Sequence, residues 1–332
     1  MIAQRLSEIS VAALPATRID KADVFELTVN VSWFEALKYM VEKRISAVPV
    51  KEGNTYIGYI DRFTFVHWAA QYAKRCMEQQ GEHSTGSTTP KAISDEITQI
   101  FTTHPLTQLE RTCFHPMVLI KETAMVSDVA EYIKNPGVYR VYLTAEDGTI
   151  SGVVTQQNFF SWLVKQPFVK ENAKYKAAVI NDLVNMATIE HKKTKQSYRT
   201  FGLNDKTYAA ITSLKRNPDD KGMADGCVML GEDDFLVTVL RRRDLDILAK
   251  IDDLTVLCAP LNRMISTVRS TEINCTVTAI TVGLGTPVEA VATRLAISRF
   301  EHAFVGSTST TTWQDIQDII TDGRIIRFIL SL

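Results

Sequence analysis

The chain has 332 residues, of which 45% are hydrophobic and 23% are charged, as in folded globular proteins. This composition excludes extended disorder, collagen-like sequence and coiled coil as the main structure, and the length suggests about two domains. The 37 basic and 38 acidic side chains leave a net charge of −1, so no overall field attracts nucleic acid or an anionic membrane. We expect neither as a partner.

The five cysteines are scattered and form no Cys-x-x-Cys pair, which argues against a disulfide framework and a zinc site. Arg5 and Glu8 interrupt the N-terminus before a signal peptide could form, and no apolar run reaches the length of a membrane span. We therefore expect a reducing compartment, the cytoplasm or the nucleus. His104, Cys113 and His115 share one loop, but their spacing favours an ordinary loop over a metal site.

Motifs of the common enzyme classes are missing, including glycine-rich dinucleotide loops, Walker-type loops, His-Glu-x-x-His and Gly-x-Ser-x-Gly. We therefore expect no catalytic residues. The chain instead contains an internal repeat, which consists of a helix, two short strands and a second helix.

The first copy begins at Ser32, which forms a predicted capping box with Glu35. Strands are predicted over 47–50 and 56–60, and a helix over 63–72. The apolar face of the first helix is predicted to consist of Phe34, Leu37, Met40 and Val41.

The second copy is predicted to start with Ser127 as helix N-cap, and Val129, Tyr132 and Ile133 follow at helical spacing. Its strands are predicted over 140–143 and 150–154. The closing helix begins near Thr155.

The third copy starts at Asp205 and has predicted strands over 227–230 and 235–240. Its closing helix opens at 241–244. Tyr208, Ile211 and Leu214 form the apolar face of its first helix.

The fourth copy opens with a predicted capping box over 286–289 that has proline at the first helical position. Strands are predicted over 303–305 and 316–320 around a Ser/Thr-rich insert, and the last helix covers 325–330. The buried face of its first helix is Val288, Val291, Ala292 and Leu295.

Two connecting segments separate these copies. Residues 79–89 are polar and of low complexity, and the Lys-rich connector over 166–200 is predicted to carry a joining strand. The predicted organisation is repeat 1 at 1–78, a polar linker at 79–100, repeat 2 at 101–166, the connector with repeat 3 at 167–250, and repeat 4 at 251–332.

The segment Gly152–Asn158, preceded by Tyr139-Arg140-Val141, resembles the CBS domain, a βαββα repeat. The helix start at 286–288 is also typical of that family. Four copies from about residue 20 to 332 resemble the gamma subunit of AMP-activated protein kinase. The resemblance implies an α/β fold of four CBS repeats that pair into two Bateman modules and form a flat disc.

Such a repeat offers binding chemistry rather than catalysis. A helix N-terminus presents free N–H groups and a positive dipole to a phosphate. A hydroxyl at the helix start and a carboxylate three residues later lie on one face, where the acid accepts both hydrogens of a ribose diol.

The resemblance carries over unevenly to this sequence. The Thr/Ser position of the family is Asp61, Thr155, Arg241 and Thr321, and its ribose-acid position is Thr64, Asn158, Asp244 and Arg324. Only Asp244 matches the acid, and Asn158 retains hydrogen-bonding capacity without the charge. Because Thr64 is short and neutral and Arg324 is a cation, we expect poor or empty ribose positions in the first and fourth repeats.

Cations for a phosphate resemble the family at Arg140 and, more loosely, at His302, whereas Ser46 and Asp225 replace basic residues in the first and third copies. This small number of cations favours weak binding, or a monophosphate or nucleoside over a triphosphate. The candidate nucleotide-binding residues are Asp244, Thr155, Asn158, Arg140, Arg241, Thr321 and His302.

Each of these residues also has a simpler interpretation. Thr155 and Thr321 can serve as helix N-caps alone, and Asp244 can serve only the helix dipole. Residues 241–243 can form a solvated or partner-binding patch, and Arg140 can be an exposed edge residue.

By resemblance, the chain is a non-enzymatic subunit that binds AMP, ADP or ATP between repeats and regulates a kinase in a heterotrimer with catalytic and scaffold subunits. It needs no cofactor besides that ligand, and two discs can form a homodimer. The alternative is a four-repeat scaffold with degenerate nucleotide sites that regulates a phosphatase or kinase through surface contact.

Overall fold

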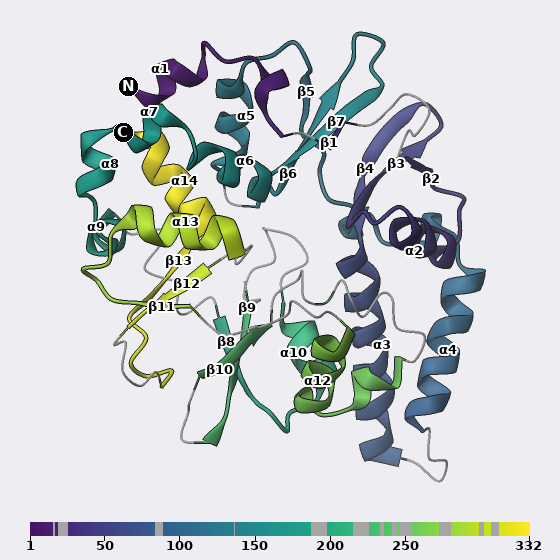
Figure 1. The fold of residues 1–332 in the computed structure, drawn as a ribbon. Coiled ribbons are helices and arrows are strands. Elements are labelled where there is room, and N and C mark those ends of the chain that lie inside the picture. The colour runs from purple at the N-terminus through teal and green to yellow at the C-terminus, as the bar shows by residue number, and fades with distance from the viewer. Residues whose placement is uncertain are drawn as a thin grey trace. The chain divides into compact units, whose positions relative to one another are not determined.

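The computed structural model divides the chain into two compact units, each built from separate stretches of sequence (Figure 1). None of its described helices has both the length and the apolarity needed to cross a membrane. The structure describes residues 1–15, 17–18, 26–83, 89–135, 137–186, 198–214, 226–232, 236–240, 245, 254–271, 280–298, 302–306 and 312–332.

The four predicted repeats are present, and each has the same strand arrangement. The first strand pairs in parallel with the second, and the second pairs antiparallel with the third. Because parallel strands need a crossover, the first helix of each repeat connects them. The predicted strands are confirmed, with ends that differ by a few residues.

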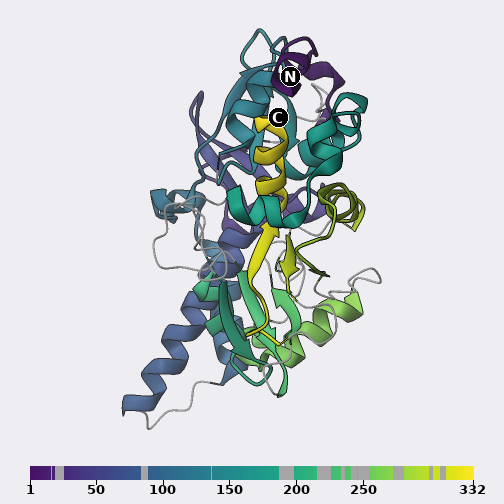
Figure 2. The same cartoon turned by 90° about the vertical axis from the view of Figure 1, so that its left-hand side faces the viewer.

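The first and third repeats form one unit, which contains Phe25–Pro116 and Gln196–Thr278. Helix α10 packs against the long helix α3, which is drawn in blue-purple in Figure 2. The elements are β2 (Leu27–Thr28), α2 (Trp33–Glu42), β3 (Ala47–Glu52), β4 (Thr55–Asp61), α3 (Arg62–His83), α4 (Pro90–Thr103), the 3-10 helices η2 (Leu106–Gln108) and η3 (Arg111–Cys113), β8 (Tyr198–Gly202), α10 (Thr207–Ser213), β9 (Gly226–Leu230), β10 (Leu236–Leu240), the 3-10 helix η6 (Leu254–Cys258) and α12 (Leu261–Thr271).

The expected polar linker over 79–100 contains the end of α3 and most of α4. Helix α4 is amphipathic and buries Ile93, Ile97 and Phe101, which places it against α2, α3 and η6. This part of the expected linker therefore belongs to the core of the unit. Residues 84–88, which the linker prediction also covered, lie outside the described residues.

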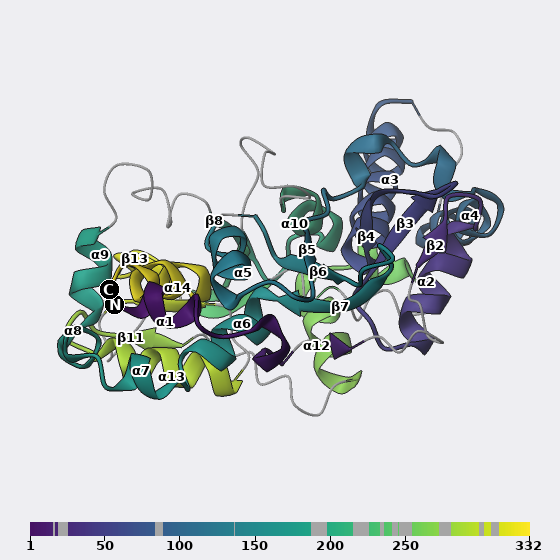
Figure 3. The same cartoon turned by 90° about the horizontal axis from the view of Figure 1, so that it is seen from above.

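The second and fourth repeats form the other unit, which contains Met1–Val24, Met117–Lys195 and Ala279–Leu332. Helix α14 packs against α1, α6 and α13, and α6 also packs on α13 (Figure 3). The elements are α1 (Ile2–Leu6), the 3-10 helix η1 (Val11–Ala13), β1 (Thr17–Arg18), β5 (Leu119–Lys121), α5 (Val126–Ile133), β6 (Arg140–Thr144), β7 (Ile150–Thr155), α6 (Gln156–Leu163), α7 (Pro167–Lys170), α8 (Ala173–Ala177), α9 (Ile180–Met186), β11 (Thr281–Val282), α13 (Val288–Ser298), β12 (His302–Val305), β13 (Asp318–Thr321) and α14 (Asp322–Ser331).

The first two repeats exchange covering segments. Strand β1 lies in the predicted range of repeat 1 but pairs with β7 of repeat 2. His115 lies in the predicted range of repeat 2 but pairs with Tyr59 of repeat 1, with N–H···O distances of 2.8 and 3.0 Å in the two directions. Gly58 permits this approach, since a Cβ there would lie 2.6 Å from the His115 carbonyl oxygen. Each of these contacts lies within a single compact unit, and together they show where the chain crosses from one unit to the other.

Two of the predictions about caps and buried faces in the first helices are confirmed, and two are wrong. The capping box of Ser32 and Glu35 is confirmed, and so is the buried face of α13, whose four predicted members are at most 1% exposed. Phe34 is a wrong prediction: it is 46% exposed, while Trp33 is buried instead. The predicted N-cap Ser127 is also wrong, because α5 begins at Val126 and the Asp128 carboxylate accepts from the Met125 N–H.

Candidate functional site

The turn between the last strand and last helix of a repeat has one recurring geometry. In three repeats the side chain that ends the strand accepts a hydrogen bond from the backbone N–H three residues later. These bonds are Thr64 N–H to Asp61 at 3.0 Å, Asn158 N–H to Thr155 at 3.1 Å, and Arg324 N–H to Thr321 at 3.2 Å. The three turns are therefore equivalent, as the alignment predicts. Arg241 and Asp244, the corresponding residues of the third repeat, lie outside the described residues.

The strand register identifies the residue that faces each cap. Arg140 pairs with Thr155, and His302 pairs with Thr321, so both candidate cations lie directly across from a cap. In repeat 1 the facing residue is Ala47 rather than Ser46.

In repeat 3, Cys227 pairs with Leu240, the last described residue of β10. Asp225 lies outside the described residues, so its predicted position stays a prediction.

The turn of repeat 2 is partly exposed. Arg140, Thr155 and Asn158 are all half-buried. The Asn158 amide donates to the Pro15 carbonyl at 3.3 Å, which holds the segment before β1 next to the start of α6. Thr155, Asn158, Arg140 and the N-terminus of α6 thus lie at the same end of the sheet, and none of the three residues is fully buried. This combination suits an anionic, hydroxyl-bearing molecule.

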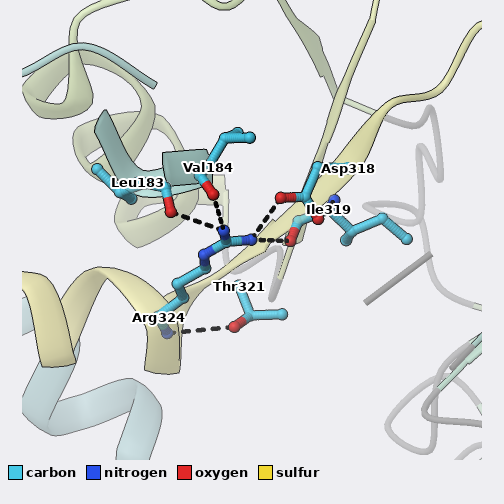
Figure 4. A network of polar contacts seen from close by, with 6 residues as sticks. All are labelled: Leu183, Val184, Asp318, Ile319, Thr321 and Arg324. Carbon is cyan, nitrogen blue, oxygen red and sulfur yellow. Dashed lines mark hydrogen bonds and ion pairs between the residues drawn. The ribbon is translucent and has the colours of Figure 1, made fainter. Parts of the chain in front are cut away.

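The equivalent turn of repeat 4 is filled by its own side chain (Figure 4). The Arg324 guanidinium donates to Asp318 at 2.8 Å and to the Leu183 carbonyl at 2.6 Å. Longer contacts reach the carbonyls of Ile319 at 3.3 Å and Val184 at 3.5 Å. Because Arg324 is only 7% exposed, a ligand would have to displace these bonds. The buried Arg324 side chain gives a physical reason for the poor ribose position expected in repeat 4.

His302 is placed by packing. Its side chain is 7% exposed, and its ring lies edge-to-face against Phe304 with centroids 5.4 Å apart. The role of His302 as a phosphate contact stays a prediction.

The turn of repeat 1 is also closed. Asp61, Thr64 and His115 are each at most 6% exposed. The Thr64 hydroxyl donates to Asp61 at 2.9 Å, and His115 Nε2 lies 3.6 Å from the other Asp61 oxygen. The stacking of His115 on Tyr59 completes the packing, with centroids 4.8 Å apart. Among the described residues, no group of three His, Cys, Asp or Glu side chains could hold a metal ion.

A basic residue that the sequence patterns did not indicate, Arg327, lies close to the turn of repeat 2. The start of α14 approaches the start of α6: a Cβ on Gly323 would lie 3.2 Å from the Gln156 amide nitrogen and 3.7 Å from Arg327. Arg327 is half-buried and donates to the Lys134 carbonyl at 3.3 Å. Burial and the nearby Arg324 charge lower the pKa of Arg327. An anion between the two helix starts would offset the repulsion between Arg327 and Arg324.

The comparisons with known proteins agree with this architecture. The sequence profile of the CBS domain matches residues 16–70 and 111–165. No curated protein matches the chain. A solved Methanocaldococcus jannaschii protein, described as a candidate archaeal homolog of g-AMPK, is 11% identical with a TM-score of 0.61 and covers 93% of this chain and 97% of its own.

Two further solved structures are similar to the chain at lower scores. An uncharacterized conserved protein from Pyrococcus horikoshii is 14% identical, covers 86% of this chain and 91% of its own, and has a TM-score of 0.45. A CBS-pair protein from Arabidopsis thaliana is 16% identical, covers 50% of this chain and 99% of its own, and has a TM-score of 0.32. Residues 16–70 and 111–165 thus match the CBS domain, and the chain as a whole shares its fold with the Methanocaldococcus jannaschii protein.

Proposed function

We propose that the chain is a regulatory subunit that binds an adenine nucleotide, with repeat 2 as the ligand site of its unit. The observation that carries the proposal is the difference between the three described turns. Those of repeats 1 and 4 are occupied by buried side chains, whereas Thr155 and Asn158 of repeat 2 remain half-buried and Thr155 lies opposite Arg140. Asp244 and Arg241 are proposed to form a second site in repeat 3 on sequence grounds.

The orientation of the ligand follows from the chemistry of the turn. The ribose hydroxyls are proposed to meet Thr155 and Asn158, and the phosphate to lie near the starts of α6 and α14, where Arg140 and Arg327 supply charge. Two such cations suit a monophosphate better than a triphosphate, so AMP is the proposed ligand over ADP and ATP. No bond is made or broken, and binding would act by shifting a conformational equilibrium.

The proposed partners are the catalytic and scaffold subunits of a protein kinase, in the cytoplasm or the nucleus. The likeness to a protein described as a candidate homolog of g-AMPK supports this partnership. A second candidate is a scaffold that regulates a phosphatase or kinase by surface contact alone. The two closed turns of repeats 1 and 4 favour that candidate, because each removes one ligand position.

Calorimetric titration of the full chain with AMP, ADP, ATP and S-adenosylmethionine separates the two candidates. Binding of AMP supports the first, and no heat with any adenine ligand refutes it. The matched variants are Thr155→Val and Thr321→Val, because each removes one N-cap and costs a similar ~1 kcal/mol of stability. Only Thr155→Val should weaken AMP. Equal affinity of both variants for AMP would show that the AMP site is not in repeat 2.

Affinity purification of the tagged chain tests the partners. Recovery of kinase catalytic and scaffold subunits supports the first candidate. Recovery of phosphatase subunits alone supports the scaffold.

A further inference from the structure

Arg324 connects the last helix of repeat 4 to a helix that lies outside all four repeats. Helix α9 belongs to the connector between repeats 2 and 3, and its last four carbonyls have no partner within the helix. Two of these carbonyls, from Leu183 and Val184, accept from one guanidinium nitrogen at 2.6 and 3.5 Å. A cation at this end also complements the negative end of the helix dipole.

The other guanidinium nitrogen fixes Arg324 to its own repeat. It donates to Asp318 at 2.8 Å and to the Ile319 carbonyl at 3.3 Å, both on β13 (Figure 4). The planar guanidinium therefore bridges β13 and α9. Arg324 and Leu183 are 141 residues apart in the sequence. The side chains of Arg324 and Asp318 are 8% and 14% exposed, so water screens the pair weakly.

The start of α9 is held by different bonds. The Ile180 and Asn181 N–H groups donate to the carbonyls of Thr286 and Leu284, each at 2.9 Å. These acceptors belong to the segment that leads into α13. Repeat 4 thus holds the first turn of α9 through its backbone and the last turn through Arg324.

We propose that Arg324 turns the ribose position of repeat 4 into a docking site for α9, which anchors the connector whether or not nucleotide is bound. Arg324 is a positioning residue in this scheme, and α9 with Asp318 takes the place of a ligand. The proposal stands independently of nucleotide binding at repeat 2. It predicts that repeat 4 holds the connector and leaves ligand response to other repeats.

Hydrogen exchange measured by mass spectrometry on the full chain tests the docking. Arg324→Met keeps an unbranched apolar stem and removes all four contacts. We expect the amides of 180–186 to exchange at least tenfold faster, while those of α5 stay unchanged. The control is Thr321→Val, which loosens the start of the same helix without touching α9. In that control we expect faster exchange in the first turn of α14 alone.

Milder variants decide the matter if Arg324→Met does not fold. Asp318→Asn keeps the carbonyl contacts and loses the ion pair, and Arg324→Lys cannot span both elements from one nitrogen. Both should raise α9 exchange several-fold, Arg324→Lys more strongly. Unchanged α9 exchange in a folded Arg324 variant would overturn the proposal. Equal acceleration in Thr321→Val would do the same, because it would show general loosening. Slower α9 exchange on adding AMP to the parent chain would refute ligand-independent anchoring.

Discussion

Replacing Asn158 by aspartate has opposite expected effects on stability and on ligand binding. The Asn158 amide nitrogen donates to the Pro15 carbonyl at 3.3 Å. Aspartate would place a carboxylate oxygen against that carbonyl, so a hydrogen bond of about 1 kcal/mol is replaced by repulsion. The new charge near the start of α6 returns roughly 0.3–1 kcal/mol through the helix dipole. We expect a net loss of about 1 kcal/mol, or about 2–4 °C in the thermal midpoint.

The effect on binding follows from counting acceptors. With its nitrogen bonded to Pro15, Asn158 has only Oδ1 left to accept from a ribose hydroxyl. Carboxylate accepts from both hydroxyls, and charged hydrogen bonds contribute about 1.5–3 kcal/mol. Asn158→Asp should therefore bind AMP about 10- to 100-fold more tightly.

Calorimetry with AMP and 2′-deoxyAMP measures this difference. The parent chain should prefer AMP only a few-fold, and Asn158→Asp should prefer it at least tenfold. Asn158→Ala, which loses both contacts, should be less stable and bind more weakly. The reasoning is refuted if Asn158→Asp is more stable, or if it binds AMP no more tightly than the parent. A parent chain that binds neither nucleotide contradicts the nucleotide proposal and leaves the stability test intact.

Three further predictions concern stability and thiol chemistry. Gly58→Ala should lower the free energy of unfolding in urea by about 1–3 kcal/mol, since its Cβ would meet the His115 carbonyl; Gly148→Ala, with positive φ but open space, should cost less. Glu35→Ala should lower the urea midpoint by opening the capping box, and an unchanged urea midpoint would contradict that role. Burial raises the pKa of Cys227 to about 12, so iodoacetamide should leave this thiol unmodified at pH 8 until urea unfolds the chain. Since the pKa of the unfolded thiol is its ordinary value of 9.0, the contribution of Cys227 to stability should be complete below that pH and decline as pH rises toward 12. Rapid labelling of Cys227 in the folded chain would refute the prediction of a protected thiol.

Local patterns were sufficient for the elements of each repeat, because turns, caps and alternation act over a few residues. The box of Ser32 and Glu35 is one example. The exposure of Phe34 was not predictable in this way, since the stripe alone does not show which side α4 covers. Helix α4 did leave a signal: Ile93, Ile97 and Phe101 recur at four-residue spacing. The polar stretch before it concealed that signal.

The candidate site was predictable only as a set of equivalent positions. Alignment of the strand ends placed Thr155 and Thr321 at helix caps, and both accept the expected N–H. What fills each turn depends on residues far away in the sequence, such as His115 at Asp61 and Leu183 at Arg324. No periodicity encodes those contacts. The grouping of alternate repeats into compact units is hidden for the same reason.

These contacts explain why few basic residues at the helix caps are available to bind a phosphate. A cap turn without a ligand still has backbone N–H groups and buried polar atoms that need partners. In repeat 1 the polar groups of the turn contact a carboxylate, a hydroxyl and an imidazole. In repeat 4 the guanidinium of Arg324 donates to α9. Cations used internally are not available to a phosphate. The number of nucleotides bound per chain should therefore follow the number of open turns, which is one among the three described and at most two if repeat 3 binds through Asp244.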